Sequence, residues 1–332
     1  MGVNLRKVTV IFKCFGFIGG LKYSLFKAMG LILRPVFITF GRPNWLADIL
    51  KKISDVTDHM VSEYIYYKYQ WIYAKYDLHV DNGAIPDKKI MWTAWLQGTQ
   101  DLPEAVEVSI ASMKNHAHGY ELRVVTLENL KKFTKIDVNI LNRLKNKKIS
   151  AAHFTDYLRV KLLSEYGGVW LDATEFLTKD LPEDIWDYDL LVWNKVQDLS
   201  GRNAYVSIPF VEKFNNGFLV GKRNALFYKF ATEISEKLLF DPILEIDYFS
   251  NFKAYFAAVR YIPLIRQEWN DMRVINPYGL ITRQFWNEKI TVNIKHYINS
   301  SESFFFVLTY KEKWISVIDG EKTVQQYLIE EC

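Results

Sequence analysis

The stretch that decides the fold is AAHFTDYLRVKLLSEYGGVWLDAT, residues 151–174. Its first part has leucines at helical spacing and predicts a helix over residues 154–166, which a Gly-Gly pair then ends. Its second part, residues 169–171, is a short apolar run that predicts a β-strand. Asp172 follows directly, at the carboxyl end of this strand, which is where ligands bind in open α/β sheets.

The predicted helix carries Asp156 and Arg159 on one face, because positions three apart are neighbours on a helix. Its leucines lie on the other side and are expected to face the sheet. Together with Asp172, these two residues form one polar cluster above an apolar floor. A lone carboxylate suits a Mg²⁺ or Mn²⁺ ion that keeps its waters and is shared with substrate phosphates.

Strand and helix patterns alternate on both sides of this stretch, which predicts an α/β fold with helices on both faces of a sheet. The further predicted strands are residues 89–95, 120–127, 190–193 and 218–220, and the further helices are residues 101–115, 137–144 and 225–239. Asp101 is expected to cap the first of these helices, because Pro103 and Glu104 follow it at capping-box spacing. The sequence contains no glycine-rich phosphate loop, so a P-loop or a dinucleotide-binding fingerprint is excluded.

The composition excludes several other classes of protein. The chain has 332 residues, of which 49% are hydrophobic, and this rules out global disorder. Its two cysteines, Cys14 and Cys332, lie near opposite ends and cannot build a disulfide framework or a cysteine-rich zinc site. The six histidines show no metal-binding spacing.

Residues 1–47 contain seven basic residues and no acidic one, whereas the whole chain has 42 basic and 38 acidic residues. The excess positive charge is therefore concentrated in this segment, which argues against a nucleic-acid-binding domain. Three lysines and Arg34 interrupt the apolar runs, so a membrane-spanning helix is not expected. A cleavable signal peptide over residues 8–20 is an alternative, but Lys13 lies inside its apolar core and no Ala-x-Ala cleavage site follows. Basic charge among Phe, Leu and Ile is typical of a segment that lies on an anionic membrane surface. The competing interpretation is an extra helical layer packed on the main domain.

The sequence indicates two parts of the chain. Residues 46–75 have helical spacing, and the turn-rich residues 81–87 form a break after them. We therefore expect a basic and apolar helical extension over residues 1–82, related to the membrane surface or to an acceptor. A catalytic domain is expected over residues 83–332.

Residues 151–174 resemble the capsular polysaccharide synthesis glycosyltransferases, which are relatives of the DXD-containing glycosyltransferase 32 type. The family pattern is a Ser/Thr-Asp-x-x-Arg helix, a Tyr-Gly-Gly turn and an apolar strand that ends in Asp. Residues 89–98 are similar to the first strand of the family, and the resemblance covers residues 89–182, and more loosely the chain to about residue 313. It implies a GT-A-like (Rossmann-like) mixed sheet flanked by helices that binds a nucleotide-sugar.

The resemblance also implies roles for individual residues. Trp95 would stack on the nucleobase, and Trp92 competes with it for this role. Asp156 would hydrogen-bond ribose or sugar hydroxyls, and Arg159 would contact the donor sugar or orient Asp156. Asp172 would ligate the Mn²⁺ or Mg²⁺ ion that bridges the diphosphate and stabilises the departing nucleotide.

The sequence departs from the family pattern at two points. The second carboxylate of a DXD motif is replaced by Thr174, and Glu175 is expected on the other face if the strand continues. Near the end of the chain, relatives often have a histidine before a Lys-Leu-Thr/Ser-aromatic-Lys element, and Phe306 begins the matching stretch here. A third metal ligand is therefore left open, and Lys311 is expected either to touch phosphate or to be solvated.

Two further candidates come from the second half of the chain. Asn216 lies in an Asn-rich element that family members carry near the donor sugar, although an Asn-Gly pair is also a common hairpin signal. Asp247 begins an Asp-Tyr-Phe element similar to one in the family and would contact the acceptor hydroxyl.

These observations predict a metal-dependent, retaining glycosyltransferase of the hexosyltransferase type. Its partners would be a nucleotide-sugar, an oligosaccharide or lipid-linked polysaccharide-repeat acceptor, and the cytoplasmic surface of the cell membrane, where it would be peripheral. The retaining stereochemistry is implied by the resemblance alone. Two alternatives remain: a phosphosugar transferase, and a membrane-bound carbohydrate-binding scaffold with a degenerate site.

Overall fold

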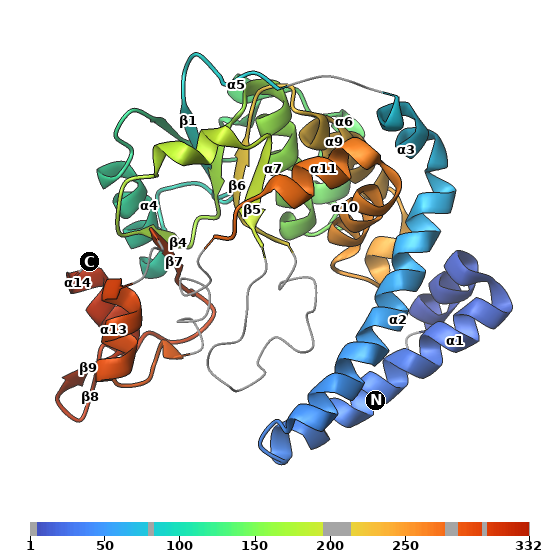
Figure 1. Ribbon diagram of the computed structural model, residues 1–332, viewed down its shortest axis with the longest axis horizontal. Helices are drawn as coiled ribbons and strands as arrows, with labels where there is room; N and C mark the ends of the chain where they lie inside the picture. The colour runs from blue at the N-terminus through green and yellow to red at the C-terminus, as the bar shows by residue number, and fades with distance from the viewer. Residues whose placement is uncertain (1–4, 79–82, 195–213, 276–284, 301–303, 332) are drawn as a thin grey trace.

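The computed structural model describes residues 5–78, 83–194, 214–275, 285–300 and 304–331 (Figure 1). The helices are α1 Leu5–Thr39, α2 Asn44–Lys68, α3 Gln70–Asp77, α4 Glu104–Asn115, α5 Leu130–Phe133, α6 Val138–Lys145, α7 Ala151–Tyr166, η1 Glu183–Asp187, α9 Leu226–Leu238, η2 Pro242–Glu245, α10 Ser250–Tyr261, α11 Pro263–Asp271, α13 Val292–Ser300 and α14 Val324–Glu331. The strands are β1 Ile90–Ala94, β2 Glu121–Val125, β3 Gly168–Leu171, β4 Glu175–Leu177, β5 Leu190–Trp193, β6 Asn215–Gly221, β7 Phe305–Val307, β8 Val317–Ile318 and β9 Glu321–Lys322.

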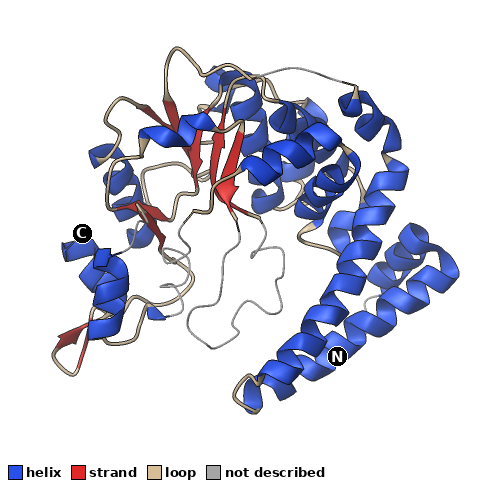
Figure 2. Ribbon diagram, viewed as in Figure 1, coloured by secondary structure: helices blue, strands red, loops and turns tan. Residues whose placement is uncertain are grey.

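A five-stranded sheet of order β2-β1-β3-β6-β5 forms the centre of the molecule. Strand β1 pairs in parallel with β2 and β3, and β6 pairs antiparallel with both β3 and β5. Every residue of β1, β3 and β5 is buried, as continuous apolar strands require when helices cover both faces of a sheet. Figure 2 shows this arrangement of strands and helices. The prediction of a mixed α/β fold is confirmed.

The Gly-Gly pair after α7 is required by the backbone. Gly167 has φ 70° and Gly168 has φ 115°, a region that other residues rarely adopt. A Cβ on Gly168 would lie 2.5 Å from the carbonyl oxygen of Ile90, so only glycine lets β3 approach β1 this closely. The pair therefore both ends α7 and sets the start of β3.

The predicted cap at Asp101 is wrong. Helix α4 begins at Glu104, and the residue before it is Pro103, with extended φ/ψ and no side-chain hydrogen bond to the helix. Proline pre-sets the backbone at the start of a helix, which places Asp101 too far upstream to reach the free N–H groups. Three other helices have side-chain caps: Asp137 accepts from Asn139 N in α6, Ser150 accepts from His153 N in α7, and Asp241 accepts from Ile243 N in η2.

Helices α1 and α2 lie side by side and extend away from the sheet (Figure 1). Helix α1 is interrupted at Gly16, whose φ of 68° and ψ of −175° are not helical. Helix α2 packs against α10, and its buried residues Val61 and Ile65 join the main hydrophobic core, as Tyr23 of α1 also does. The two helices are thus anchored on the body at one end.

One face of α1 remains uncovered. Its exposed apolar residues recur every three or four positions and include Ile18, Leu21, Leu25, Met29, Ile32 and Val36. By length and composition, α1 is long and apolar enough to cross a membrane, and it is the one helix of the described residues that meets this test. Lysines interrupt its apolar runs, and for this reason no spanning helix was expected; the length and mean hydropathy of α1 differ from that expectation. A core helix or a signal sequence passes the same test.

The contact between α11 and the start of α9 contains a buried carboxyl. Glu268 of α11 accepts a hydrogen bond from the backbone N–H of Phe227, and Lys222 and Asp189 lie nearby. Burial, together with the negative charge of Asp189, raises the pKa of Glu268 to about 8. The folded protein therefore holds a proton here that the unfolded chain releases near pH 4.5.

We expect Glu268→Gln to stabilise the protein at high pH. The stabilisation from the bound proton is complete below the unfolded pKa and is lost as the pH rises through about 8 in the wild type. Each pKa unit corresponds to about 1.4 kcal/mol, so the variant should exceed the wild type by roughly a few kcal/mol at about pH 9 and match it at about pH 4. Urea unfolding across this range measures the difference, and equal pH profiles for the two proteins would contradict the assignment.

Candidate active site

Helix α7 carries the two charged residues predicted from its sequence. Asp156 and Arg159 are 8% and 5% exposed, although both are ionisable. Charged groups are rarely buried without partners, so their surroundings must satisfy them. The structure supplies these partners from β3 and β6.

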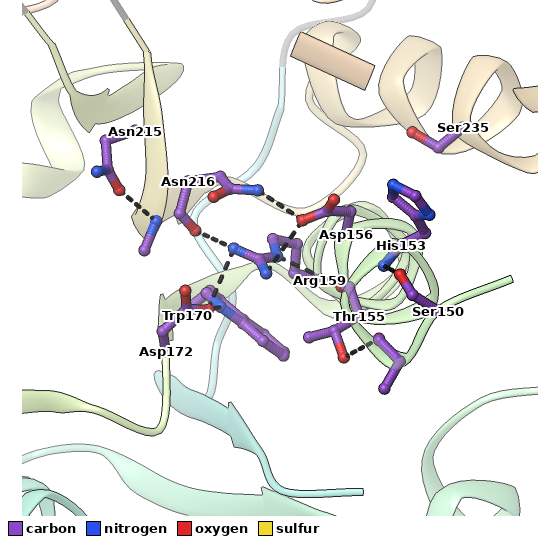
Figure 3. Close-up of polar contacts among 12 residues, drawn as sticks. Ser150, His153, Thr155, Asp156, Arg159, Trp170, Asp172, Asn215, Asn216 and Ser235 are labelled. Atoms are coloured by element: carbon purple, nitrogen blue, oxygen red, sulfur yellow. Dashed lines mark hydrogen bonds and ion pairs between the residues drawn. The ribbon is translucent and has the colours of Figure 1, made fainter. Parts of the chain in front are cut away.

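Arg159 lies between two carboxylates (Figure 3). Its Nη2 is 3.2 Å from Asp156 Oδ1, and its Nη1 is 3.1 Å from Asp172 Oδ1. The same Nη1 donates to the backbone carbonyl of Asn216, and the guanidinium lies 5.3 Å from the centre of the Trp170 ring. The predicted cluster of Asp156, Arg159 and Asp172 is therefore present as one connected network.

Asn216 joins this network because of the strand register. Leu171 of β3 pairs with Phe218 of antiparallel β6, which brings the start of β6 beside Asp172. Asn216 Nδ2 donates to Asp156 Oδ1 at 2.7 Å. Asn216 and Gly217 belong to a strand, so the alternative that they form a hairpin turn does not hold.

A pocket of about 290 Å³ opens beside the cluster. Asp156, Arg159 and Asp172 line one side of it, and residues 307–311 line another, including Lys311. The pocket also has an aromatic wall formed by Phe214, Tyr248, Phe249 and Phe252. Tyr248 is 54% exposed, so its ring is available to a ligand.

A second pocket of about 190 Å³ shares Arg159 and Asp172 with the first. It is lined by Trp95 and Tyr310, whose rings meet edge to face at 5.3 Å. Trp92 is fully buried, and its Nε1 donates to the carbonyl of Gly167, so it lies in the core and not in the pocket. Of the two tryptophans, Trp95 is the one that lines a pocket.

Glu175 was expected on the other face only if the strand continued past Asp172, and this condition does not hold. Strand β3 ends at Leu171, residues 172–174 form a turn, and a separate strand begins at Glu175. Strand alternation therefore does not run through this turn. Glu175 is 2% exposed and lines the same pocket as Asp172 and Thr174, and its carboxylate lies against Gly217.

The side chains of the cluster can bind a cation only if a bound substrate supplies most of the oxygen ligands. Among the described residues, no group of three or more His, Cys, Asp or Glu side chains is arranged to hold a metal ion. Asp172 accepts from Trp170 Nε1 at 2.8 Å and from Arg159 through one oxygen, Oδ1, and its side chain is 36% exposed. A hard cation that shares one carboxylate with a diphosphate and water fits this arrangement.

Asp156 has an unusual environment for a carboxylate. Burial raises the pKa of its carboxyl, while the neighbouring Arg159 and His153 oppose this change. His153 in turn contacts the pocket wall, because its Nε2 lies 3.2 Å from the carbonyl oxygen of Tyr248. Asp156 is thus held between a cation and a hydrogen-bond donor, in a position to accept from a ligand hydroxyl.

The structure does not bring Asp247 to the pocket. Its side chain is 3% exposed and is paired with Lys253 of α10, which also contacts Asp58 of α2 at 2.6 Å. Lys27 of α1 lies 3.9 Å away. The next residue, Tyr248, lines the pocket instead. The Asp-Tyr-Phe element thus contributes its aromatic residues to the site and its aspartate to a buried ion cluster.

Sequence reasoning missed the aromatic wall and Tyr310. The Asp-Tyr-Phe element was singled out for Asp247 and not for Tyr248, and Phe214 gave no signal, because isolated aromatic residues are common in cores. Only the exposure of Tyr248 and of Tyr310, 54% and 47%, distinguishes them from core rings, and exposure depends on the tertiary structure.

A mixed α/β sheet with a charged, ligand-sized pocket at the end of its central strand is typical of enzymes that bind polar substrates.

Residues 42–328 match the family described as "Capsular polysaccharide synthesis protein", and the chain belongs to this family. It is 37% identical over 91 residues to the O-glycosyltransferase braB of Annulohypoxylon truncatum. That match covers 26% of this chain and about a fifth (20%) of the relative. A solved structure titled "PaToxG Glycosyltransferase" is similar at 15% identity and a TM-score of 0.32, over 74% of this chain and 95% of that one.

Proposed function

We propose that the protein is a glycosyltransferase that moves a hexose from a nucleotide-sugar to a lipid-linked polysaccharide-repeat acceptor. The observation that carries this proposal is the network of Asp156, Arg159 and Asp172 at the end of β3, where two pockets meet. The family description and the name of the curated relative support the same chemistry.

In this proposal the two pockets divide the donor between them. The nucleobase stacks on Trp95, since base–aromatic stacking contributes about 1–3 kcal/mol. The diphosphate lies over Arg159 and Asp172, which line both pockets. The sugar enters the larger pocket. Asp156 accepts hydrogen bonds from its hydroxyls, and Asn216 donates to them. Tyr248 covers one face of the sugar ring.

In the proposed mechanism, Asp172 would hold a Mn²⁺ or Mg²⁺ ion together with oxygens of the substrate and water. Such an ion supplies Lewis-acid stabilisation of the leaving diphosphate. Arg159 adds a fixed positive charge at the same place, and its orientation is set by Asp156 and the Asn216 carbonyl. A preorganised charge of this kind stabilises the transition state without reorganisation. We propose that the transfer retains the configuration of the donor sugar.

A panel of nucleotide-sugars with Mn²⁺ tests this function against its two alternatives. Glycosyl transfer releases a nucleoside diphosphate, whereas phosphosugar transfer releases a nucleoside monophosphate. A scaffold releases neither, and its sugar binding does not respond to metal. Release of nucleoside diphosphate supports the proposal, and either other result contradicts it. NMR of the product's anomeric signal then tests retention.

We further propose that the protein is peripheral at the cytoplasmic surface of the cell membrane. The exposed face of α1 is apolar over several turns, and residues 1–47 carry no acidic side chain. An apolar helix face with basic flanks binds anionic lipid surfaces. This location places the active site beside a lipid-linked acceptor.

The double variant Leu25→Glu/Ile32→Glu should abolish membrane binding without unfolding the protein. Both side chains are exposed, 59% and 68%, so the change costs little stability but places negative charge on the lipid-facing surface. Sedimentation with vesicles containing phosphatidylglycerol measures the effect. Val292→Glu, at an 83% exposed position of α13, is the matched control and should bind like the wild type. Unchanged binding by the double variant would exclude this face of α1.

A further inference from the structure

A second basic region of the protein lies in helices α5 and α6 and in the turn that follows them. Residues 131–148 contain seven basic residues and one acidic residue, Asp137. The carboxylate of Asp137 is engaged as the cap of α6, where it accepts from Asn139 N. The overall charge of the chain conceals this region, because acidic residues elsewhere balance it.

The end of α6 fixes the backbone of two of these lysines. Lys148 N donates to the carbonyl of Arg143 at 2.8 Å, and Lys147 N donates to the carbonyl of Leu144 at 3.0 Å. This pair of hydrogen bonds defines a Schellman turn. Lys147 occupies the left-handed position of the turn, with φ 52°, where glycine is usual. A basic side chain therefore stands where the backbone favours a residue without one.

Lys147 and Lys148 are exposed and line a pocket of about 520 Å³ between this turn, the start of α7 and η2. Arg143 also lines this pocket, here named the basic pocket. Its Nε donates to the carbonyl of Leu239 at 2.9 Å, and its guanidinium lies 5.2 Å from the centre of the Phe240 ring. Among the described residues, neither lysine has an ion-pair partner.

The two acidic residues of the basic pocket are each neutralised by a cation from another element. Asp241 lies 2.8 Å from Lys68 of α2 and also accepts hydrogen bonds from two tyrosine hydroxyls. Glu245 lies 2.7 Å from Arg6 of α1. The three basic residues of the lining are therefore not balanced from within it, and their positive charge favours an anion.

The basic pocket lies beside the first turn of α1, the helix that we place on the membrane. Helix α1 packs against η2, and Arg6 reaches the lining of the pocket through Glu245. Leu5, in the same turn as Arg6, is 77% exposed. Basic charge next to exposed apolar side chains is typical of surfaces that bind anionic lipids, so these surroundings favour a lipid over a soluble anion.

The basic pocket also adjoins the active site. Ala151, in the first turn of α7, lines both the basic pocket and the pocket that contains Trp95. His153 lines the basic pocket, and its Nε2 lies 3.2 Å from the carbonyl oxygen of Tyr248, a residue of the larger active-site pocket. The first turn of α7 therefore separates the basic pocket from the active site. A surface bound at this turn fixes the position of the active site relative to it.

We propose that the basic pocket of Arg143, Lys147 and Lys148 binds the phosphate group of an anionic phospholipid at the membrane surface. Guanidinium and ammonium groups both donate to phosphate oxygens. The pocket gives the protein a second point of attachment besides α1 and holds the first turn of α7 against the lipid surface. This inference rests on the proposed peripheral location and adds a lipid site on a different part of the chain.

Sedimentation of the full chain with vesicles of phosphatidylglycerol and phosphatidylcholine in equal parts tests the basic pocket. The variant Lys147→Gly/Lys148→Gln should bind these vesicles about tenfold or more weakly than the wild type, because two basic residues near an anionic surface are lost. Its melting temperature should not fall, since glycine suits the left-handed backbone at position 147. A loss of vesicle binding in this variant is therefore not a loss of folding.

Lys131→Gln/Lys132→Gln is the matched control. It removes the same charge from exposed positions of α5, which lies at the top of Figure 1, far from α1 at the lower right, and neither lysine lines the basic pocket. This variant should bind the vesicles like the wild type. An equal loss in the control would show nonspecific charge attraction and overturn the site. Tight binding of inorganic pyrophosphate that Lys147→Gly/Lys148→Gln abolishes would assign the pocket to a soluble anion and overturn the lipid.

The same assay separates the basic pocket from the proposed peripheral location. A wild type that stays in solution with the vesicles overturns the location and, with it, this site. A wild type that binds the vesicles, together with a Lys147→Gly/Lys148→Gln variant that binds them equally well, overturns the basic pocket alone.

Discussion

Replacement of Asp172 with asparagine is expected to lower donor turnover by about 10²–10³-fold, comparable to the loss of one preorganised electrostatic group in an active site. The substitution keeps the shape of the side chain but removes the charge that pairs with Arg159 and that we assign to the metal. Because the Asp172 side chain is 36% exposed, its ion pair contributes little to folding, and the variant should be destabilised by less than about 1 kcal/mol.

Turnover of the nucleotide-sugar, followed by release of nucleoside diphosphate, measures this effect, and thermal unfolding checks the fold. Asp87→Asn is the matched control, because Asp87 is exposed and lines neither of the two active-site pockets. Asp172→Asn with wild-type turnover would remove this carboxylate from the catalytic machinery.

Replacement of Lys253 with methionine is expected to destabilise the protein by about 3–5 kcal/mol, since it leaves two buried carboxylates without their cation. Lys253 is 3% exposed and contacts both Asp58 and Asp247. Burial by itself lowers the pKa of Lys253, but these two carboxylates raise it overall. The cluster therefore connects α2, α10 and the segment that leads into the pocket wall.

Urea unfolding measures the loss, with Lys131→Met on the surface as the control. The triple variant Lys253→Met/Asp58→Asn/Asp247→Asn should recover much of the stability, because it removes the unpaired charges as well as the cation. A loss of less than about 1 kcal/mol in Lys253→Met would show that the cluster does not stabilise the fold.

The part of the site that is formed by α7 and by the end of β3 could be predicted from the sequence. Local signals determine it: helical spacing places Asp156 and Arg159 on one face, and an apolar strand of four residues delivers Asp172 to the sheet edge. The central strands were found for the same reason, since buried strands are short apolar runs.

The rest of the site depends on tertiary contacts that local patterns do not contain. The side chain of Glu175 could not be placed from the sequence, because a turn interrupts strand alternation after Asp172. The direction of Asp247 was set by Lys253 and by α2, which is distant in the sequence. Trp95 and Tyr310 meet across more than 200 positions, and only the folded chain shows that they share a pocket.

The central claim is that Arg159 and Asp172 hold a cation-bridged diphosphate. The most direct measurement is calorimetric titration of the full chain with UDP, GDP, ADP, CDP and dTDP, with and without Mn²⁺, in the wild type, Asp172→Asn and Arg159→Lys. We expect one of these nucleotides to bind the wild type only with Mn²⁺. The affinity of Asp172→Asn for this nucleotide should be the same with and without Mn²⁺. Arg159→Lys should bind the nucleotide only weakly. Nucleotide binding that is equal in all three proteins and indifferent to Mn²⁺ would contradict it.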